Sequence, residues 1–151
     1  MNMKKVISLA VVLFIAIFSA GCSVLEFPES SSSEIVASMP EADTDGAFEA
    51  KTLSEQYEMY PEKMEEHEGE VWDVQGSFYT ISSPDRSPVI QMEQEAVMGY
   101  IYFYMSEDDP TDFVKLAEEL SEGDKIIVRG TLSGKMGHIM VKDCWYIGKA
   151  E

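Results

Sequence analysis

Cys22 is the residue whose type and position point most clearly to covalent chemistry. It directly follows the small residues Ser19-Ala20-Gly21, and the almost wholly apolar stretch Val6 to Phe18 precedes them, after two lysines. A charged segment, an apolar segment and a small-residue cleavage site together form an export signal. The apolar stretch is shorter than the roughly 20 residues that a membrane-spanning helix needs. A thiol at such a cleavage site can be alkylated by a lipid before the signal is removed.

The segment resembles the signal and lipobox of bacterial lipoproteins. The resemblance implies that residues 1–21 are a signal peptide and that Cys22 carries a lipid. The chain would then be extracytoplasmic and anchored to the bacterial cell membrane, with the lipid bilayer as a partner through the acylated cysteine. An ordinary secretory signal with a coincidental cysteine is the alternative.

The charge balance of the chain is strongly acidic. The full sequence carries a net charge of −17, and removal of the signal, which holds two lysines and no acidic residue, makes it −19. Phosphate backbones and anionic headgroups repel such a chain, so nucleic acid is not an expected partner. The 130 residues that remain after cleavage suffice for one compact domain and a tether.

Residues 22–50 are expected to form the lipidated cysteine and an acidic, disordered tether, because they are rich in Ser, Glu, Pro and Ala and can bury little apolar surface. Within them, the run Glu41-x-Asp43-x-Asp45-Gly46 resembles the first part of an EF-hand calcium loop. That loop requires Asp at its first position and Glu at its twelfth, where this chain has Glu41 and Thr52. A coincidence in an acidic linker is the expected explanation, and a calcium-responsive module is an alternative.

The folded domain is expected to span residues 51–151 and to begin with a helix over 51–68. Four apolar residues recur there at helical spacing and make one stripe. They are Leu53, Tyr57, Tyr60 and Met64. Thr52 or Ser54 is expected as the N-cap. Because Pro61 removes a helical hydrogen bond, two short helices are the alternative.

After Gly69 the spacing of the apolar residues changes from 3.6 to 2, which predicts strands. The five predicted strands are 71–81, 88–93, 99–105, 125–132 and 136–147. Gly76 inside the first strand predicts a bulge or bend. A helix with Asp109 as its N-cap and Gly123 at its end is expected between the third and fourth strands. Residues 133–135 are expected to form the turn of the last hairpin.

Three strands, a helix and a two-stranded hairpin are the element order of the OB-fold. The expected fold class is therefore mainly β: a five-stranded OB-fold barrel with a helix between strands 3 and 4 and an N-terminal amphipathic helix. Two stretches of the sequence resemble the tRNA_anti-like family of bacterial OB-fold proteins. They are Leu120 to Leu132, with its Gly-Asp-Lys turn, and the closing Val141-Lys142-Asp143-Cys144. The resemblance covers about Leu53 to Ile147. It implies an exported lipoprotein with an OB-fold and implies no activity.

Three tyrosines of the third predicted strand are the candidate ligand-binding residues. When the apolar residues between them face the core, strand alternation turns Tyr100, Tyr102 and Tyr104 to the opposite side. There they would form a platform on which a planar group or a sugar stacks. Gln91 and Glu93 of the preceding strand would add polar contacts. The alternative is that this row is buried beneath the amphipathic helix.

The sequence contains no recognisable catalytic constellation or zinc-spaced ligand set, so no enzyme activity, metal site or cofactor is expected. Cys144 lies in an apolar strand and is expected to be a buried, inert thiol. We therefore predict a membrane-anchored lipoprotein of the cell envelope whose OB-fold module binds a protein or a cell-wall glycan without catalysis. The alternative is a structural or interaction lipoprotein that has no small ligand. The sequence leaves the oligomeric state open.

Overall fold

The computed structural model describes residues 38–93 and 99–151 of the chain. Cys22 and the predicted signal peptide lie outside the described residues. Residues Met39–Glu151 form one compact unit. In the part of the chain that is described, no helix is long and apolar enough to cross a membrane.

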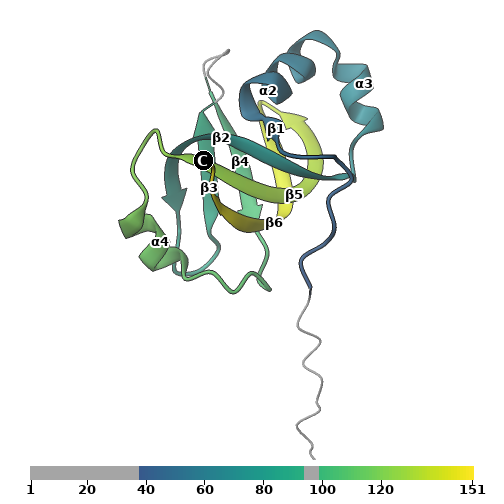
Figure 1. Ribbon diagram of the computed structural model, residues 1–151. Coiled ribbons are helices and arrows are strands. Elements are labelled where there is room, and N and C mark those ends of the chain that lie inside the picture. The colour runs from purple at the N-terminus through teal and green to yellow at the C-terminus, as the bar shows by residue number, and fades with distance from the viewer. Residues whose placement is uncertain (1–37, 94–98) are drawn as a thin grey trace, which may run out of the picture. The chain divides into compact units, whose positions relative to one another are not determined.

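Five of the strands close into a barrel. The elements in chain order are β1 (Phe48–Glu49), α2 (Ala50–Met59), α3 (Pro61–Glu66), β2 (Val71–Ser82), β3 (Val89–Glu93), β4 (Tyr100–Met105), α4 (Phe113–Glu119), β5 (Lys125–Met136) and β6 (His138–Lys149). The barrel order is β2-β3-β4-β6-β5, and β5 pairs back with β2. Within the barrel only β4 and β6 run parallel. This order, with α4 between β4 and β5 (Figure 1), is that of the OB-fold, so the predicted fold class is confirmed.

β2 reaches both of its neighbours in the barrel because it bends near its middle. Its first part, from Val71 to Ser77, pairs with β5, and its second part pairs with β3 after a register shift between Phe78 and Thr80. Gly76 lies just before this shift, and a Cβ atom on it would stand 2.7 Å from the Cβ of Ala50. The glycine therefore lets the first residue of α2 approach the strand closely.

Alternate side chains of the strands fill the barrel interior. Those of β3 and β4 that are fully buried are Ile90, Met92, Ile101 and Phe103. α2 lies against β1, β2 and β3. It and α3 add Leu53, Tyr57 and Met64 to the same apolar cluster. The helices thus share one hydrophobic core with the barrel.

The N-terminal helical segment consists of two short helices, which is the alternative predicted from Pro61. Tyr60 separates them with φ −137° and ψ 55°, and Pro61 occupies the first position of α3, where a missing N–H costs little. Tyr60 is 46% exposed, so its predicted place in the apolar stripe is wrong. The predicted N-caps are also wrong, because α2 follows Glu49 and both Thr52 and Ser54 lie inside the helix.

The compact unit begins at Met39, so the predicted boundary between tether and domain at residues 50 and 51 is corrected. β1 pairs in parallel with β2. The backbone N–H of Asp43 donates to the carbonyl of Val71 at 2.7 Å, and the N–H of Val71 donates to Oδ2 of Asp43 at 2.8 Å. These contacts use mainly backbone groups, which apolar patterning does not detect. In the calcium-loop-like run, one Asp43 carboxylate oxygen is thus hydrogen-bonded to the barrel.

The predicted N-cap of α4 differs from the structure. Asp112, and not Asp109, caps α4 by accepting a hydrogen bond from the N–H of Lys115 at 3.1 Å. The carboxylate of Asp109 instead accepts from the N–H groups of Thr111 and Tyr146, each at 2.8 Å. Asp109 therefore joins the β4–α4 loop to β6.

The last hairpin turns at Gly137, and not at residues 133–135 as predicted. β5 continues to Met136 and contains a register shift between Leu132 and Lys135. Gly134 lies within this shift at φ +89°. A left-handed backbone of this kind favours glycine, so the predicted turn residues form a bulge within β5.

Candidate ligand-binding face

The predicted alternation of β4 is confirmed. Ile101 and Phe103 are fully buried, whereas Tyr104 is 37% exposed. Tyr100 and Tyr102 are half-buried and lie on the same outer side of the strand. The three tyrosines therefore line the outside of the barrel; that they bind a ligand stays a prediction.

The register between β3 and β4 places the two predicted polar residues beside the tyrosines. Glu93 pairs with Tyr100 and Gln91 pairs with Tyr102. The amide Nε2 of Gln91 donates to Oγ of Ser82 at 2.9 Å, which holds the side chain in place on the outer side of the sheet. All five candidate residues are thus brought onto one surface.

Two further aromatic side chains extend the row into what we call the tyrosine face: Tyr79, Tyr100, Tyr102, Tyr104 and His138. The rings of Tyr79 and Tyr100 stack with their centroids 4.3 Å apart and an interplanar angle of 24°. The rings of Tyr102 and His138 lie 4.1 Å apart at 44°. These ring pairs hold Tyr100 and Tyr102 from either side of β4, because Tyr79 belongs to β2 and His138 to β6.

The hydroxyl group of Tyr100 keeps its proton at neutral pH. A hydrogen bond with Tyr79 raises the pKa of Tyr100, and burial and the negative charges of Glu93 and Glu122 raise it further. The Tyr100 ring therefore offers a neutral aromatic surface with a polar edge. On His138, the buried Nε2 atom has no hydrogen-bond partner among the described residues.

The amphipathic helix does not cover the tyrosine face, so the alternative that buried these residues beneath it is wrong. α2 lies against β1, β2 and β3, and its Leu53 and Tyr57 belong to the barrel core. Tyr100 and Tyr102 each contact one of the rings described above. Tyr104 is exposed, and Tyr100 and Tyr102 are half-buried.

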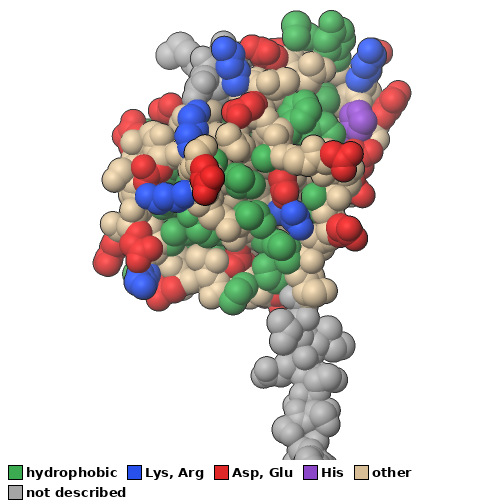
Figure 2. All heavy atoms as spheres, viewed as in Figure 1, with side chains coloured by type: hydrophobic (Ala, Val, Ile, Leu, Met, Phe, Trp, Pro, Cys, Tyr) green, Lys and Arg blue, Asp and Glu red, His purple; other side chains and the backbone are tan. Residues whose placement is uncertain are grey.

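Basic side chains on the barrel are largely engaged by carboxylates. Arg129 donates to both oxygens of Asp73 at 2.6 and 2.8 Å and to the carbonyl of Pro40 at 3.1 Å. Lys149 pairs with Asp124 at 2.8 Å. On the side of the molecule shown in Figure 2, the lysines and arginines are scattered singly among acidic side chains. That side shows no continuous basic track of the kind that follows a phosphate backbone.

Cys144 is fully buried in β6. Burial raises the pKa of its thiol well above the ordinary value, and the charges of Asp143 and Asp109 add to this effect. A thiol is a poor nucleophile when it stays protonated. The structure therefore agrees with the predicted inert thiol.

Sequence reasoning missed Tyr79 and His138. The alternation of β2 was enough to place Tyr79 outside the barrel. The contact between Tyr79 and Tyr100 was not predictable, because it depends on how two strands that are distant in the sequence are aligned. His138 meets Tyr102 only because β4 and β6 run side by side, and no local pattern reveals a parallel pairing.

Solved structures that resemble the chain include OBody NL8 bound to hen egg-white lysozyme, at 17% identity and a TM-score of 0.39, covering 54% of this chain and 98% of that one. Another is asparaginyl-tRNA synthetase from Pyrococcus horikoshii, at 14% identity and a TM-score of 0.40, covering 57% of this chain and 21% of the synthetase. No curated protein matches the chain. The model of the tRNA_anti-like family matches residues 1–145, and the chain belongs to that family.

Proposed function

We propose that the chain is an extracytoplasmic lipoprotein, anchored to the bacterial cell membrane through acylated Cys22, whose barrel is a non-catalytic binding module for a cell-wall glycan. The observation that carries the binding proposal is the tyrosine face on β2, β4 and β6, with its two close ring pairs. The anchoring proposal is supported by the order of residues 1–22 in the sequence.

The chemistry of the tyrosine face suits a sugar chain. Aromatic rings give a large, rigid apolar surface with a polar hydroxyl at the edge, and the C–H face of a sugar ring can stack on it. The amide of Gln91 both donates and accepts hydrogen bonds, and the carboxylate of Glu93 accepts them from hydroxyl groups. OB-folds bind oligosaccharides and oligonucleotides across this same side of the barrel. The net charge of −19 that the chain would carry after signal removal favours the sugar over the oligonucleotide.

An envelope protein is the second candidate ligand. Tyr and Met are enriched in protein interfaces, and Met59, Tyr60 and Met136 are exposed on this unit at 58%, 46% and 77%. A protein partner would engage these side chains, whereas a glycan would engage the tyrosine face.

Replacing Cys22 with serine is expected to move the protein from the membrane fraction to the soluble fraction. Serine keeps the small-residue run but offers no sulfur for the lipid. Metabolic labelling with palmitate followed by cell fractionation measures both effects, and Cys144→Ser is the matched control that should keep label and membrane location. A wild-type chain that takes up no label would contradict the anchor.

Binding is tested by sedimenting the full chain, in a non-ionic detergent, with purified insoluble cell-wall glycan. The proposal expects saturable co-sedimentation that soluble glycan fragments compete away and that a single-stranded oligonucleotide leaves unchanged. Competition by the oligonucleotide, or no co-sedimentation at all, would contradict the glycan as ligand. Retention of an envelope protein instead would favour the second candidate.

A further inference from the structure

β6 carries an extra residue where it passes Tyr104. Between the strand pairs that flank this position, one residue of β4, Tyr104, stands opposite two residues of β6, Lys142 and Asp143. The register of β6 with its other neighbour, β5, shifts at the same place. Two residues opposite one form a β-bulge, a feature that re-aims side chains and is over-represented next to active sites.

The bulge turns both of its side chains outward. Val141 and Cys144, on either side of it, are fully buried in the barrel, whereas Lys142 and Asp143 are exposed. Tyr104, the most exposed tyrosine of the tyrosine face, lies across from them on β4. Because neighbouring strands are only about 4.8 Å apart, the two charged residues stand directly beside this ring on the barrel surface.

The backbone of Asp143 has a conformation that the contacts of its side chain do not explain. Its φ is +50°, in the left-handed region, which costs free energy for a residue with a Cβ atom. Asp visits this region when its carboxylate forms a local hydrogen bond. Among the described residues, however, the Asp143 carboxylate has neither a hydrogen-bond partner nor an ion-pair partner. Within that part of the chain, no polar contact of the side chain offsets the strain.

The bulge supplies the polar groups that the other side of Tyr104 lacks. On β3, Glu93 pairs with Tyr100 and Gln91 pairs with Tyr102, but the partner of Tyr104 is the apolar Val89. On β6, the same ring meets an exposed carboxylate and an exposed ammonium group. The tyrosine row is thus bordered by polar side chains along its whole length, from β3 at one end and from β6 at the other.

Strained backbone of this kind is concentrated at binding and active sites, where the strain holds a side chain in place for its task. A sugar ring that stacks on Tyr104 presents hydroxyl groups at its edge, and the bulge sets a carboxylate along that edge. A carboxylate accepts hydrogen bonds on two oxygens and donates none, so it matches neighbouring hydroxyl groups. Lys142 carries its charge on a long flexible stem, whereas the short side chain of Asp143 is directed by its backbone.

We propose that Asp143 is a specificity-determining residue of the tyrosine face, where it accepts hydrogen bonds from the hydroxyl groups of the sugar ring that stacks on Tyr104. The inference rests on the proposed glycan-binding function and adds one property of the ligand. The sugar unit at Tyr104 carries free hydroxyl groups, and esterified hydroxyl groups are disfavoured there because they have no proton to donate.

Asp143→Gly separates binding from folding. Glycine adopts a φ of +50° without strain, so the melting temperature of the variant should equal or exceed that of the wild type. Its affinity for soluble cell-wall glycan fragments should fall by about tenfold, because charge-assisted hydrogen bonds are lost. Isothermal titration of the full chain in a non-ionic detergent measures the affinity. A lower melting temperature with unchanged affinity would show that Asp143 serves the fold and not the ligand.

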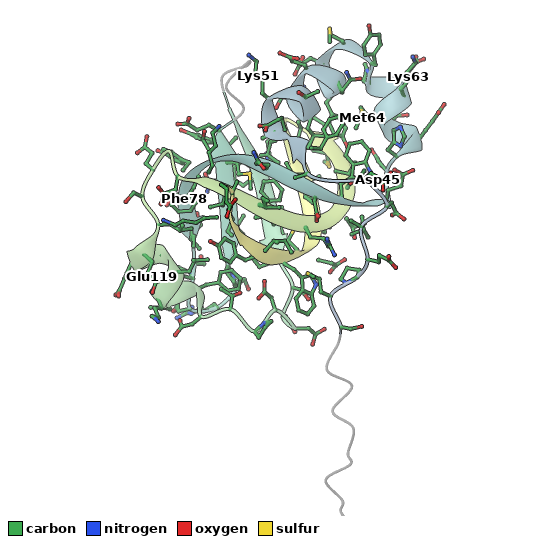
Figure 3. All side chains as sticks on the ribbon, viewed as in Figure 1. Asp45, Lys51, Lys63, Met64, Phe78 and Glu119 are labelled. Carbon is green, nitrogen blue, oxygen red and sulfur yellow. The ribbon has the colours of Figure 1, made fainter. Side chains whose placement is uncertain are left out.

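Two further variants control for charge and for shape. Asp45 is likewise an exposed aspartate, but it lies on the segment before β1 and outside the strands (Figure 3). Asp45→Gly removes the same charge and should bind as the wild type does, whereas an equal loss would assign the effect to net charge. Asp143→Asn tolerates the left-handed backbone and keeps one acceptor oxygen, so its affinity should lie between those of the wild type and Asp143→Gly.

Chemical O-acetylation of the fragments tests the ligand side of the contact. Acetylation removes the O–H donors, so it should weaken binding to the wild type. It should weaken binding to Asp143→Gly by a smaller factor, because this variant has already lost the acceptor. Equal factors in the two proteins would mean that Asp143 does not meet these hydroxyl groups, and would overturn the inference.

The inference and the proposed function fail in different ways. A wild type that does not bind the fragments overturns both. A wild type that binds, with an affinity that Tyr104→Ala lowers and Asp143→Gly leaves unchanged, keeps the glycan-binding function and overturns the role of Asp143.

Discussion

Leu53→Ala is expected to lower the free energy of unfolding by about 3 kcal/mol, the largest effect of any single truncation considered for the helices. Leu53 is fully buried and belongs to the same apolar cluster as the barrel strands. Its truncation would leave a cavity between α2 and the sheet, because the barrel side chains around it are held by backbone pairing. The loss is a large fraction of the total stability of a small domain.

Chemical denaturation of Leu53→Ala measures this loss, and Met59→Ala is the matched control. Met59 lies on the same helix but is 58% exposed, so its truncation should change stability by no more than about 0.5 kcal/mol. Equal, small effects of the two substitutions would show that α2 does not share a core with the barrel.

Gly130→Ala is expected to destabilise the barrel by about 2 kcal/mol through overpacking. A Cβ atom at this position in β5 would stand 2.5 Å from Sγ of Cys144 and 2.8 Å from Cγ1 of Val141. Both neighbours lie on β6 and are fully buried, so neither can move aside without displacing the core. The backbone of Lys142 is also close, at 3.1 Å.

A double-mutant cycle with Cys144→Ala tests the cause. Removal of Sγ takes away the nearest clash, so the double variant should lose less stability than the sum of the two single losses. Additive losses would mean that the glycine is needed for a reason other than the contact with Cys144. Urea melts of the four proteins supply all the free energies of unfolding.

The barrel was predictable from the sequence because its strands obey simple local rules. The two-residue alternation in β4 placed Ile101 and Phe103 inside and the tyrosines outside, and the structure agrees. The packing of residues 39–49 was not predictable. That segment is held by backbone pairing to β2 and by the contact of Arg129 with Pro40, and neither leaves an apolar pattern in the sequence.

The candidate sites show the same division between local and long-range information. Tyr100, Tyr102 and Tyr104 are visible in one strand, whereas His138 joins them only through the parallel pairing of β4 and β6.

The affinity of the Tyr104→Ala variant for soluble cell-wall glycan fragments is the measurement that decides whether the tyrosine face is a binding site. Tyr104 is the most exposed tyrosine of the face, at 37%, so its truncation should leave the melting temperature nearly unchanged. Tyr60→Ala removes an exposed tyrosine elsewhere on the domain and serves as the control. We expect Tyr104→Ala to weaken binding by about tenfold, or about 1.4 kcal/mol, and Tyr60→Ala to bind as the wild type does. Equal affinities of wild type and Tyr104→Ala would contradict the proposed role of the face.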